Sequence, residues 1–194
     1  MTVTAPSGFR AAGVAAGIKA SGGADVAVVI NDGPSRAAAG VFTSNRVKAA
    51  PVRWSQQVLL GGQLRAVVLN SGGANACTGP AGFADTHHTA EHLAKVLTGA
   101  GGEAGAGAGA AGEVGAGEIA VCSTGLIGER LPMDRLLAGV EAAAGGASAD
   151  GGAAGGHRQR LRRLAVRVPA PRGPLARHRI GDRLERRAPA GRGR

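Results

Sequence analysis

Apolar residues in the first 145 positions follow two patterns, one typical of strands and one of helices. Short, mainly apolar runs predict strands at 26–30, 37–43, 65–70 and 118–122, and the run at 26–30 is continuously apolar and rich in β-branched residues. The turn-forming sequence Asn-Asp-Gly-Pro at 31–34 separates the first two runs. We therefore expect those two strands to pair as a hairpin.

Apolar residues at helical spacing predict three helices. Pro51 can open a short helix over 51–60, because proline suits the first helical turn. Asp85 can cap a second helix over 86–98, and Pro132 can open a third. The expected buried positions are Ala90, Leu93, Ala94 and Leu97 in the second helix, and Met133, Leu136, Leu137 and Val140 in the third.

Two stretches have few side chains that could form a core. Residues 99–117 are almost entirely Gly and Ala, and we expect a disordered low-complexity insertion there. After a second Gly/Ala stretch, residues 157–194 hold 13 Arg, no Lys and two acids. Arginine this dense without lysine is typical of a GC-rich gene read in the wrong frame. We therefore divide the chain into a body, 1–145, and a disordered tail, 146–194, produced by a frameshift near 145–157.

Charge and cysteine usage narrow the class of protein. The net charge is +10, but residues 1–156 carry 10 basic against 11 acidic side chains, so the basicity belongs to the tail. Because the basic tail could bind phosphates, the alternative function is that of a non-enzymatic nucleic-acid-binding protein. The tail lacks the aromatic residues that would stack on bases. Two distant cysteines, no signal peptide and no long apolar run predict a cytoplasmic protein without a membrane partner.

Two short motifs match patterns of cofactor or metal sites. Residues 107–112 fit GxGxxG, but the dinucleotide fingerprint needs a preceding strand and a following helix, so we attribute the match to the glycine-rich tract. Residues 88–92 fit HxxEH, in which His88 and His92 share a helix face. A zinc site also needs a third ligand and an enclosed pocket, so we interpret these histidines as a solvated face. We expect no cofactor and no metal.

Two polar segments at strand ends, 70–79 and 122–128, are the candidate site. Both combine small residues with hydroxyl groups, which are Ser71, Thr78, Ser123 and Thr124. Small residues let a ligand approach the backbone, and free N–H groups with a hydroxyl can stabilise a developing negative charge. Tight turn chemistry explains the same residues, and local physics leaves both interpretations open.

Five segments in order resemble the bifunctional ornithine acetyltransferase/glutamate N-acetyltransferase family of the cyclic arginine pathway. The resemblance covers residues 8–145. Its segments are Gly8-Phe9 with Gly13–Lys19, Val41–Asn45 with Ala50–Val52, the 70–79 loop, Ser123–Gly128, and Leu131–Asp134.

The resemblance implies a fold, an activity and a site. The fold is an α/β layered sandwich of the self-cleaving, N-terminal-nucleophile-like type. The family transfers an acetyl group from N-acetylornithine to glutamate, and some members also use acetyl-CoA. Its oxyanion hole maps onto the hydroxyl of Thr124 and the backbone N–H of Gly125. Its assembly is an α/β heterotetramer.

The sequence departs from the family after residue 145. The Thr-Thr-Asp-Thr segment and the Ala-Thr-Met-Leu cleavage site, which carries the nucleophilic threonine, are absent from the 194 residues. We therefore expect an incomplete sandwich without the β chain, inactive as a fragment and aggregation-prone through exposed apolar surface and unpaired strand edges.

Overall fold

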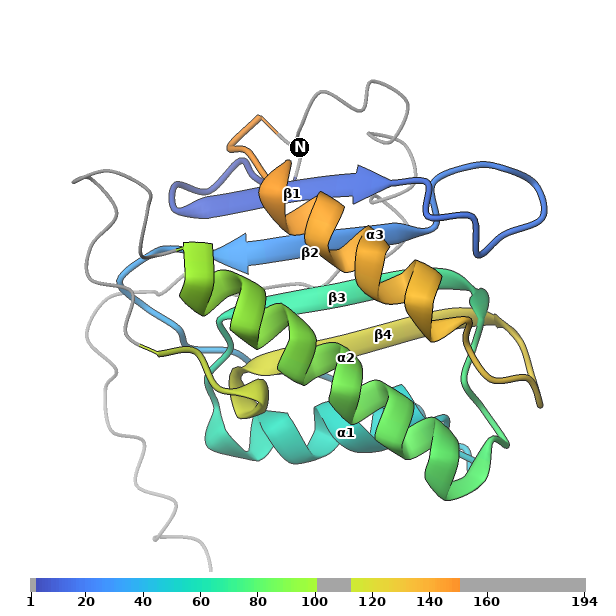
Figure 1. Ribbon diagram of the computed structural model, residues 1–194. Coiled ribbons are helices and arrows are strands. Elements are labelled where there is room, and N and C mark those ends of the chain that lie inside the picture. Colours follow the sequence, from blue (N-terminus) through green and yellow to red (C-terminus); the bar gives the residue numbers. More distant parts are fainter. Residues whose placement is uncertain (1–2, 101–112, 151–194) are drawn as a thin grey trace, which may run out of the picture.

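A four-stranded mixed sheet forms the centre of the computed structural model, which describes residues 3–100 and 113–150. The strands lie side by side in chain order (Figure 1): β1 (Phe9–Val14), β2 (Val26–Asn31), β3 (Ala66–Gly73) and β4 (Ile119–Leu126). The β1–β2 and β2–β3 pairs are antiparallel, whereas β3 and β4 are parallel. A parallel pair needs a crossover connection, and a long helix lies within that connection here.

Among the described residues, three helices accompany the sheet: α1 (Ala50–Val58), α2 (Gly79–Ala100) and α3 (Met133–Gly145). Short 3₁₀ turns follow α1 (η1, Leu59–Gly61) and precede β4 (η2, Ala116–Glu118). Figure 1 shows α2 and α3 crossing the same face of the sheet, with α1 beside β4. The described residues therefore form a mixed α/β fold.

The main core lies between the sheet and the pair α2 and α3. Because side chains alternate along a strand, Val28 and Val68 face these helices. They pack there with Leu93 of α2 and Leu136 of α3, all fully buried. The opposite face carries a smaller cluster, which is Val58, Leu64, Val67, Leu69 and Ala120.

The outer strands are partly covered along their edges. The Ser55 hydroxyl of α1 donates to the Val121 carbonyl at 2.8 Å and accepts from the Val121 N–H at 2.9 Å. Trp54 Nε1 donates to the Ile119 carbonyl at 2.9 Å. At the other edge, Ala11 of β1 exchanges two backbone hydrogen bonds with Ser148. These contacts use backbone groups that an open edge would present to another chain.

Replacing Ser55 with alanine should loosen β4. The Ser55→Ala variant leaves two buried backbone groups of Val121 without a partner, and we expect a loss of about 1–3 kcal/mol in the free energy of unfolding. Urea denaturation measures it. Ser44→Ala, at an exposed position, is the control and should change stability little; equal effects would contradict the proposed role of Ser55.

The expected hairpin of 26–30 with 37–43 is wrong. The strand at 26–30 is β2, but its neighbours are β1 and β3. Within 37–43 only Ala37 makes a strand-type contact, an isolated bridge to Gln63. The turn sequence 31–34 instead leads into a segment held by ion pairs. The glycine-containing strand β1 was not predicted.

The expected cap at Asp85 is also wrong. Helix α2 begins at Gly79, so Asp85 lies inside it, with its buried carboxylate paired to Arg130. The expected disorder over 99–117 is wrong at both ends of the tract. Helix α2 continues to Ala100, and Val114 is buried with its N–H bonded to Thr98 Oγ1 at 3.2 Å. Residues 101–112, which include the GxGxxG match, lie outside the described residues.

Most of the predicted helices and core positions are confirmed, but Met133 and Leu137 of the third helix are only half-buried. Helices begin near Pro51 and directly after Pro132. The apolar runs at 65–70 and 118–122 lie in β3 and β4. In α2 the predicted face is buried, and in α3 Leu136 and Val140 are fully buried. Helix α3 ends at Gly145, and the predicted tail beyond residue 150 lies outside the described residues.

Candidate functional site at the end of the parallel strands

The two candidate segments lie side by side at the carboxyl ends of β3 and β4. In the parallel register Ser71 is opposite Thr124 and Gly72 is opposite Gly125. The register shifts at Gly73, where the pairing becomes irregular. Thr124 and Gly125 belong to strand β4 and are exposed, so the strand predicted over 118–122 continues as far as Leu126. A ligand can therefore approach an ordered strand end.

Glycine at positions 72 and 125 lets the two backbones meet. Gly125 has φ +131° and Gly72 has φ +117°, both in the region that favours glycine. A Cβ at Gly125 would lie 2.5 Å from the carbonyl carbon of Gly72. A Cβ at Gly72 would lie 2.7 Å from Ile18 Cγ2. The absence of side chains keeps this part of the strand pair close and its backbone open.

Asn70 and Ser123 tie the strands together just before the glycines. The Ser123 hydroxyl donates to Asn70 Oδ1 at 2.5 Å, and Asn70 Nδ2 donates to the Gly73 carbonyl at 3.2 Å. Asn70 is buried, so these bonds satisfy polar groups that have lost water. They fix the irregular end of β3 against β4.

The segment after β3 is held by a buried asparagine. Asn75 is fully buried at φ +49°, a conformation that asparagine tolerates better than most residues. Its Nδ2 donates to the Gly82 carbonyl at 2.7 Å and to Thr86 Oγ1 at 3.0 Å. Its Oδ1 accepts from Thr78 Oγ1 at 2.6 Å. Asn75 therefore locks the 74–79 segment onto the first turns of α2.

An ion pair anchors the segment that follows β4. Arg130 Nε and Nη2 donate to the two carboxylate oxygens of Asp85 at 2.8 and 2.6 Å. Hydrogen bonding to Asp85, together with its charge, raises the pKa of Arg130. Next to this pair, buried Leu131 packs against Gly73. The sequence offered no local signal for the pair, because its partners are far apart along the chain.

Asp25 holds the segment before β2. Its carboxylate accepts backbone N–H groups of Ala16, Ile18 and Lys19 at 2.6, 2.6 and 2.9 Å. Burial by itself raises the pKa of Asp25, but the three N–H groups and the Lys19 charge outweigh burial. The pKa therefore lies below its ordinary value of 3.8. Sequence reasoning missed this residue, whose partners are backbone groups.

The lowered pKa predicts a pH dependence of stability. A carboxyl group with a depressed folded-state pKa stabilises the fold above its unfolded value of 3.8. That stabilisation is lost as the pH falls through the lower folded-state pKa. Urea denaturation of the parent chain between about pH 5 and pH 2 should show this loss. Asp25→Asn should lack this component, and parallel curves for the two proteins would contradict the prediction.

Histidines and cysteines of the described residues form no metal centre. No group of three His, Cys, Asp or Glu side chains could hold a metal ion in residues 3–100 and 113–150. His92 Nε2 instead lies 2.9 Å from Glu141 of α3, and His88 is exposed. Cys77 and Cys122 are both free thiols. Burial raises the pKa of Cys122, which favours the neutral form near Thr124.

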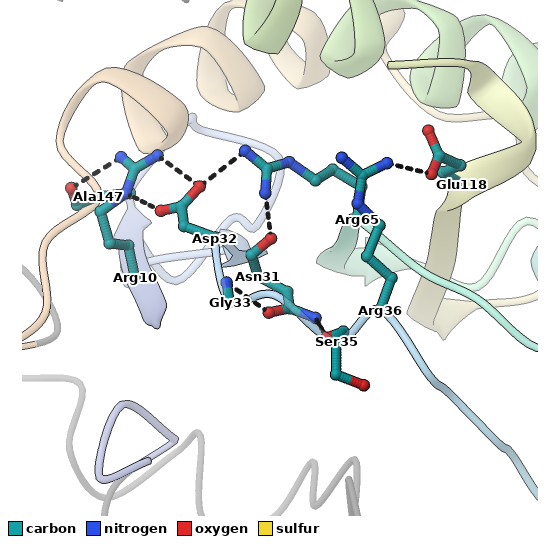
Figure 2. A network of polar contacts seen from close by, with 9 residues as sticks. All are labelled: Arg10, Asn31, Asp32, Gly33, Ser35, Arg36, Arg65, Glu118 and Ala147. Carbon is teal, nitrogen blue, oxygen red and sulfur yellow. Dashed lines mark hydrogen bonds and ion pairs between the residues drawn. The ribbon is translucent and has the colours of Figure 1, made fainter. Parts of the chain in front are cut away.

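A second polar cluster lies at the other end of the sheet, around the start of β3. Figure 2 shows Asp32 between Arg10 and Arg65, with ion-pair distances of 2.5 and 2.8 Å. Arg36 pairs separately with Glu118 at 2.7 Å. Each of the three arginines is paired with one of the two acids. We therefore assign this cluster to holding the 31–36 segment.

No helix among the described residues is both long and apolar enough to cross a membrane.

Fold and site together define a mixed α/β protein with a small-residue, hydroxyl-bearing site on two parallel strands. The model of the ArgJ family matches residues 10–159. The chain belongs to the ArgJ family. This confirms the family resemblance, whereas nothing in the comparisons favours the nucleic-acid-binding alternative.

Individual relatives agree with this assignment. The chain is 70% identical over 138 residues to the arginine biosynthesis bifunctional protein ArgJ of Mycobacterium tuberculosis, which covers 71% of this chain and 32% of the relative. The chain is 64% identical over 152 residues to the arginine biosynthesis bifunctional protein ArgJ of Thermobifida fusca. That match covers 78% of this chain and 36% of the relative. The chain thus spans about a third of the length of these relatives.

Two crystal structures resemble the fold. An ornithine acetyltransferase from M. tuberculosis, complexed with ornithine, matches with a TM-score of 0.70 and 62% identity, covering 78% of this chain and 76% of that one. The arginine biosynthesis bifunctional protein of Bacillus halodurans matches with a TM-score of 0.62 and 33% identity, covering 73% and 65%.

Proposed function

We propose that the end of the β3–β4 pair is the oxyanion hole of an acetyltransferase that moves an acetyl group from N-acetylornithine to glutamate. The Thr124 hydroxyl and the Gly125 N–H are the two donors. The observation that carries the proposal is the exposed position of both residues on an ordered strand end, in a chain 62% identical to a crystallised ornithine acetyltransferase.

The chemistry fits acyl transfer. Attack on an acetyl carbonyl places negative charge on its oxygen, and fixed donors stabilise that charge without having to reorganise. Loss of one such donor costs about 3 kcal/mol of transition-state stabilisation. Gly72 and Gly125 let the two strand ends lie close together, and the Asn70–Ser123 bond keeps the donors in place. No cofactor is needed, although acetyl-CoA can serve as a second acetyl donor.

The complete enzyme, in this proposal, has a second chain. The match to this chain covers 32% of the full-length M. tuberculosis relative. A match to a similar part of this chain covers 76% of the crystallised M. tuberculosis chain. That crystallised chain is therefore roughly half the length of the relative, which fits a precursor cut into α and β chains. The nucleophilic threonine, and the β chain of an α/β heterotetramer, belong to the remaining part. Residues 1–145 then belong to the α-chain region, and the family match continues to residue 159.

The layered sandwich also belongs to the proposal. On the sheet face opposite α2 and α3, Ala27, Val29 and Cys122 are only half-buried. A second layer from the missing part would cover them. Both substrates are small and polar, and a cytoplasmic location suits such a biosynthetic reaction.

A chimera tests the function. Residues 1–145 are joined to the part of the M. tuberculosis enzyme that follows the matched region, and acetyl transfer from N-acetylornithine to glutamate is followed. The chimera should turn over, and Thr124→Ala should lower kcat about 100-fold because one donor is lost.

Thr124→Ser is the matched control, because it keeps the hydroxyl and should retain most of the activity. The 194-residue chain without the added part should show no turnover, since its sequence contains no Ala-Thr-Met-Leu segment. An active chimera in which Thr124→Ala has normal kcat would refute the role of Thr124.

A further inference from the structure

We propose that Asp25 is a positioning residue for the oxyanion hole, acting on Gly125 through Ile18 and Gly72. The inference rests on the proposed function of the Thr124–Gly125 site and extends it to a residue that touches neither substrate nor reacting atoms. Three consecutive contacts carry it.

The first contact joins Asp25 to the segment between β1 and β2. Asp25 is 4% exposed, and its carboxylate accepts three backbone N–H groups, from Ala16, Ile18 and Lys19. A buried carboxylate with three such donors fixes the direction of each N–H group. The Asp25 carbonyl also accepts the Ser71 N–H at 2.8 Å. One residue therefore fixes both this segment and the end of β3.

The second contact joins Ile18 to Gly72. A Cβ at Gly72 would lie 2.7 Å from Ile18 Cγ2 and 3.1 Å from the Ile18 carbonyl oxygen. Ile18 thus occupies the space that a side chain at 72 would need. Because the Ile18 N–H is held by Asp25, the position of this residue depends on the carboxylate.

The third contact joins Gly72 to Gly125. A Cβ at Gly125 would lie 2.5 Å from the Gly72 carbonyl carbon and 2.7 Å from the Gly73 nitrogen. With backbones this close, a shift of Gly72 cannot be absorbed by a flexible side chain. Movement of the 16–19 segment should therefore reach the peptide that carries the Gly125 N–H.

Isotope labelling isolates that peptide in the full chain. The sequence contains three Thr–Gly pairs, 78–79, 98–99 and 124–125. Labelling with ¹³C-carbonyl threonine and ¹⁵N-glycine therefore gives three amide signals, two of which are internal references. Asp25→Asn keeps the size of the side chain but replaces one acceptor oxygen with a donor group. It should shift the Gly125 signal and speed its hydrogen exchange, while Gly79 and Gly99 stay in place.

Asp32→Asn is the matched control. The substitution is chemically the same and removes the ion pairs to Arg10 and Arg65 at the other end of the sheet. It can lower stability, but it should leave the Gly125 signal unchanged. A merely structural role of Asp25 would give the same result for both variants. An unchanged Gly125 signal in folded Asp25→Asn would overturn the proposal.

Ile18→Ala provides a second route if Asp25→Asn does not fold. It removes the side chain that lies on Gly72 and leaves the carboxylate contacts in place, so it should also shift Gly125 selectively. If Gly125 is unchanged in this variant, the contact chain is broken and the proposal fails.

The chimera separates this inference from the proposed function. There Asp25→Asn should lower kcat between about 10-fold and 100-fold with little change in KM, because a misplaced donor weakens transition-state binding. Suppose that Asp25→Asn shifts the Gly125 signal selectively, but kcat is normal in both Asp25→Asn and Thr124→Ala. That result would refute the oxyanion hole, but not the positioning of Gly125 by Asp25. Normal kcat in Asp25→Asn alone would overturn Asp25 as a positioning residue for catalysis.

Discussion

Gly125→Ala should be among the most destabilising glycine-to-alanine substitutions in the described residues. At φ +131° an alanine is strained, which costs about 1–2 kcal/mol. Its Cβ would also overlap the backbone of Gly72, which has no side chain to move aside. Overpacking of this kind costs about 1–3 kcal/mol more. We expect the free energy of unfolding to fall by about 2–5 kcal/mol, measured by urea denaturation.

Gly128→Ala is the control for backbone strain. Gly128 has φ +89°, but a Cβ there meets no atom within 4 Å. This variant should lose only the strain component, about 1–2 kcal/mol. If the free energy of unfolding falls equally in the two alanine variants, the close approach of Gly125 to Gly72 adds nothing to the cost of the Gly125→Ala substitution.

Gly82→Ala should have the second large effect. A Cβ at Gly82 would overlap Thr78 Oγ1 and Asn75 Oδ1, which are hydrogen-bonded to each other. Both must move, and Asn75 is fully buried, so its amide would lose partners where no water can replace them. Overpacking and the broken bonds together should lower the free energy of unfolding by about 2–4 kcal/mol, despite the helix preference of alanine.

Gly99→Ala in the same helix provides the comparison. A Cβ at Gly99 meets no atom within 4 Å. Alanine should therefore stabilise the protein there by up to about 1 kcal/mol, through its higher helix propensity. Thermal or urea unfolding measures both variants. The changes in the free energy of unfolding should have opposite signs if the hydrogen bonds of Asn75 require glycine at position 82. A stabilising Gly82→Ala would show that the cluster adapts.

Elements whose formation depends on local pattern were predictable. The run at 65–70 is apolar on both faces, and Leu93 lies at helical spacing from Leu97, so burial could be inferred without knowing the partners. Strand β1 was not predicted because Phe9–Val14 contains small residues and a glycine. These residues form a strand because they pair with β2. Tertiary pairing decides such segments.

The hairpin and the Asp85 cap failed for a shared physical reason. Polar residues that suit turns and caps also suit distant ion pairs. Asp32 is bound by Arg10 and Arg65, and Asp85 by Arg130, so their partners lie far away in the sequence. A single sequence shows which groups can pair, but not which do.

The candidate site was predictable in composition but not in geometry. Its small and hydroxyl-bearing residues were visible, and family resemblance pointed to Thr124 and Gly125. That Ser71 and Thr124 lie opposite each other follows only from the parallel register. Asp25 gave no signal, because a carboxylate that binds backbone N–H groups has no characteristic sequence partner.

The parallel pairing of β3 with β4 has a consequence for folding kinetics. Strands β1 and β2 are close in sequence and can pair early, whereas residues 74–118 must be spanned before β4 joins β3. The Thr124–Gly125 strand end should therefore become ordered late. Because closure entropy grows slowly with length, about 0.6 kcal/mol per doubling, the Gly/Ala tract in that connection can lengthen with little effect on stability.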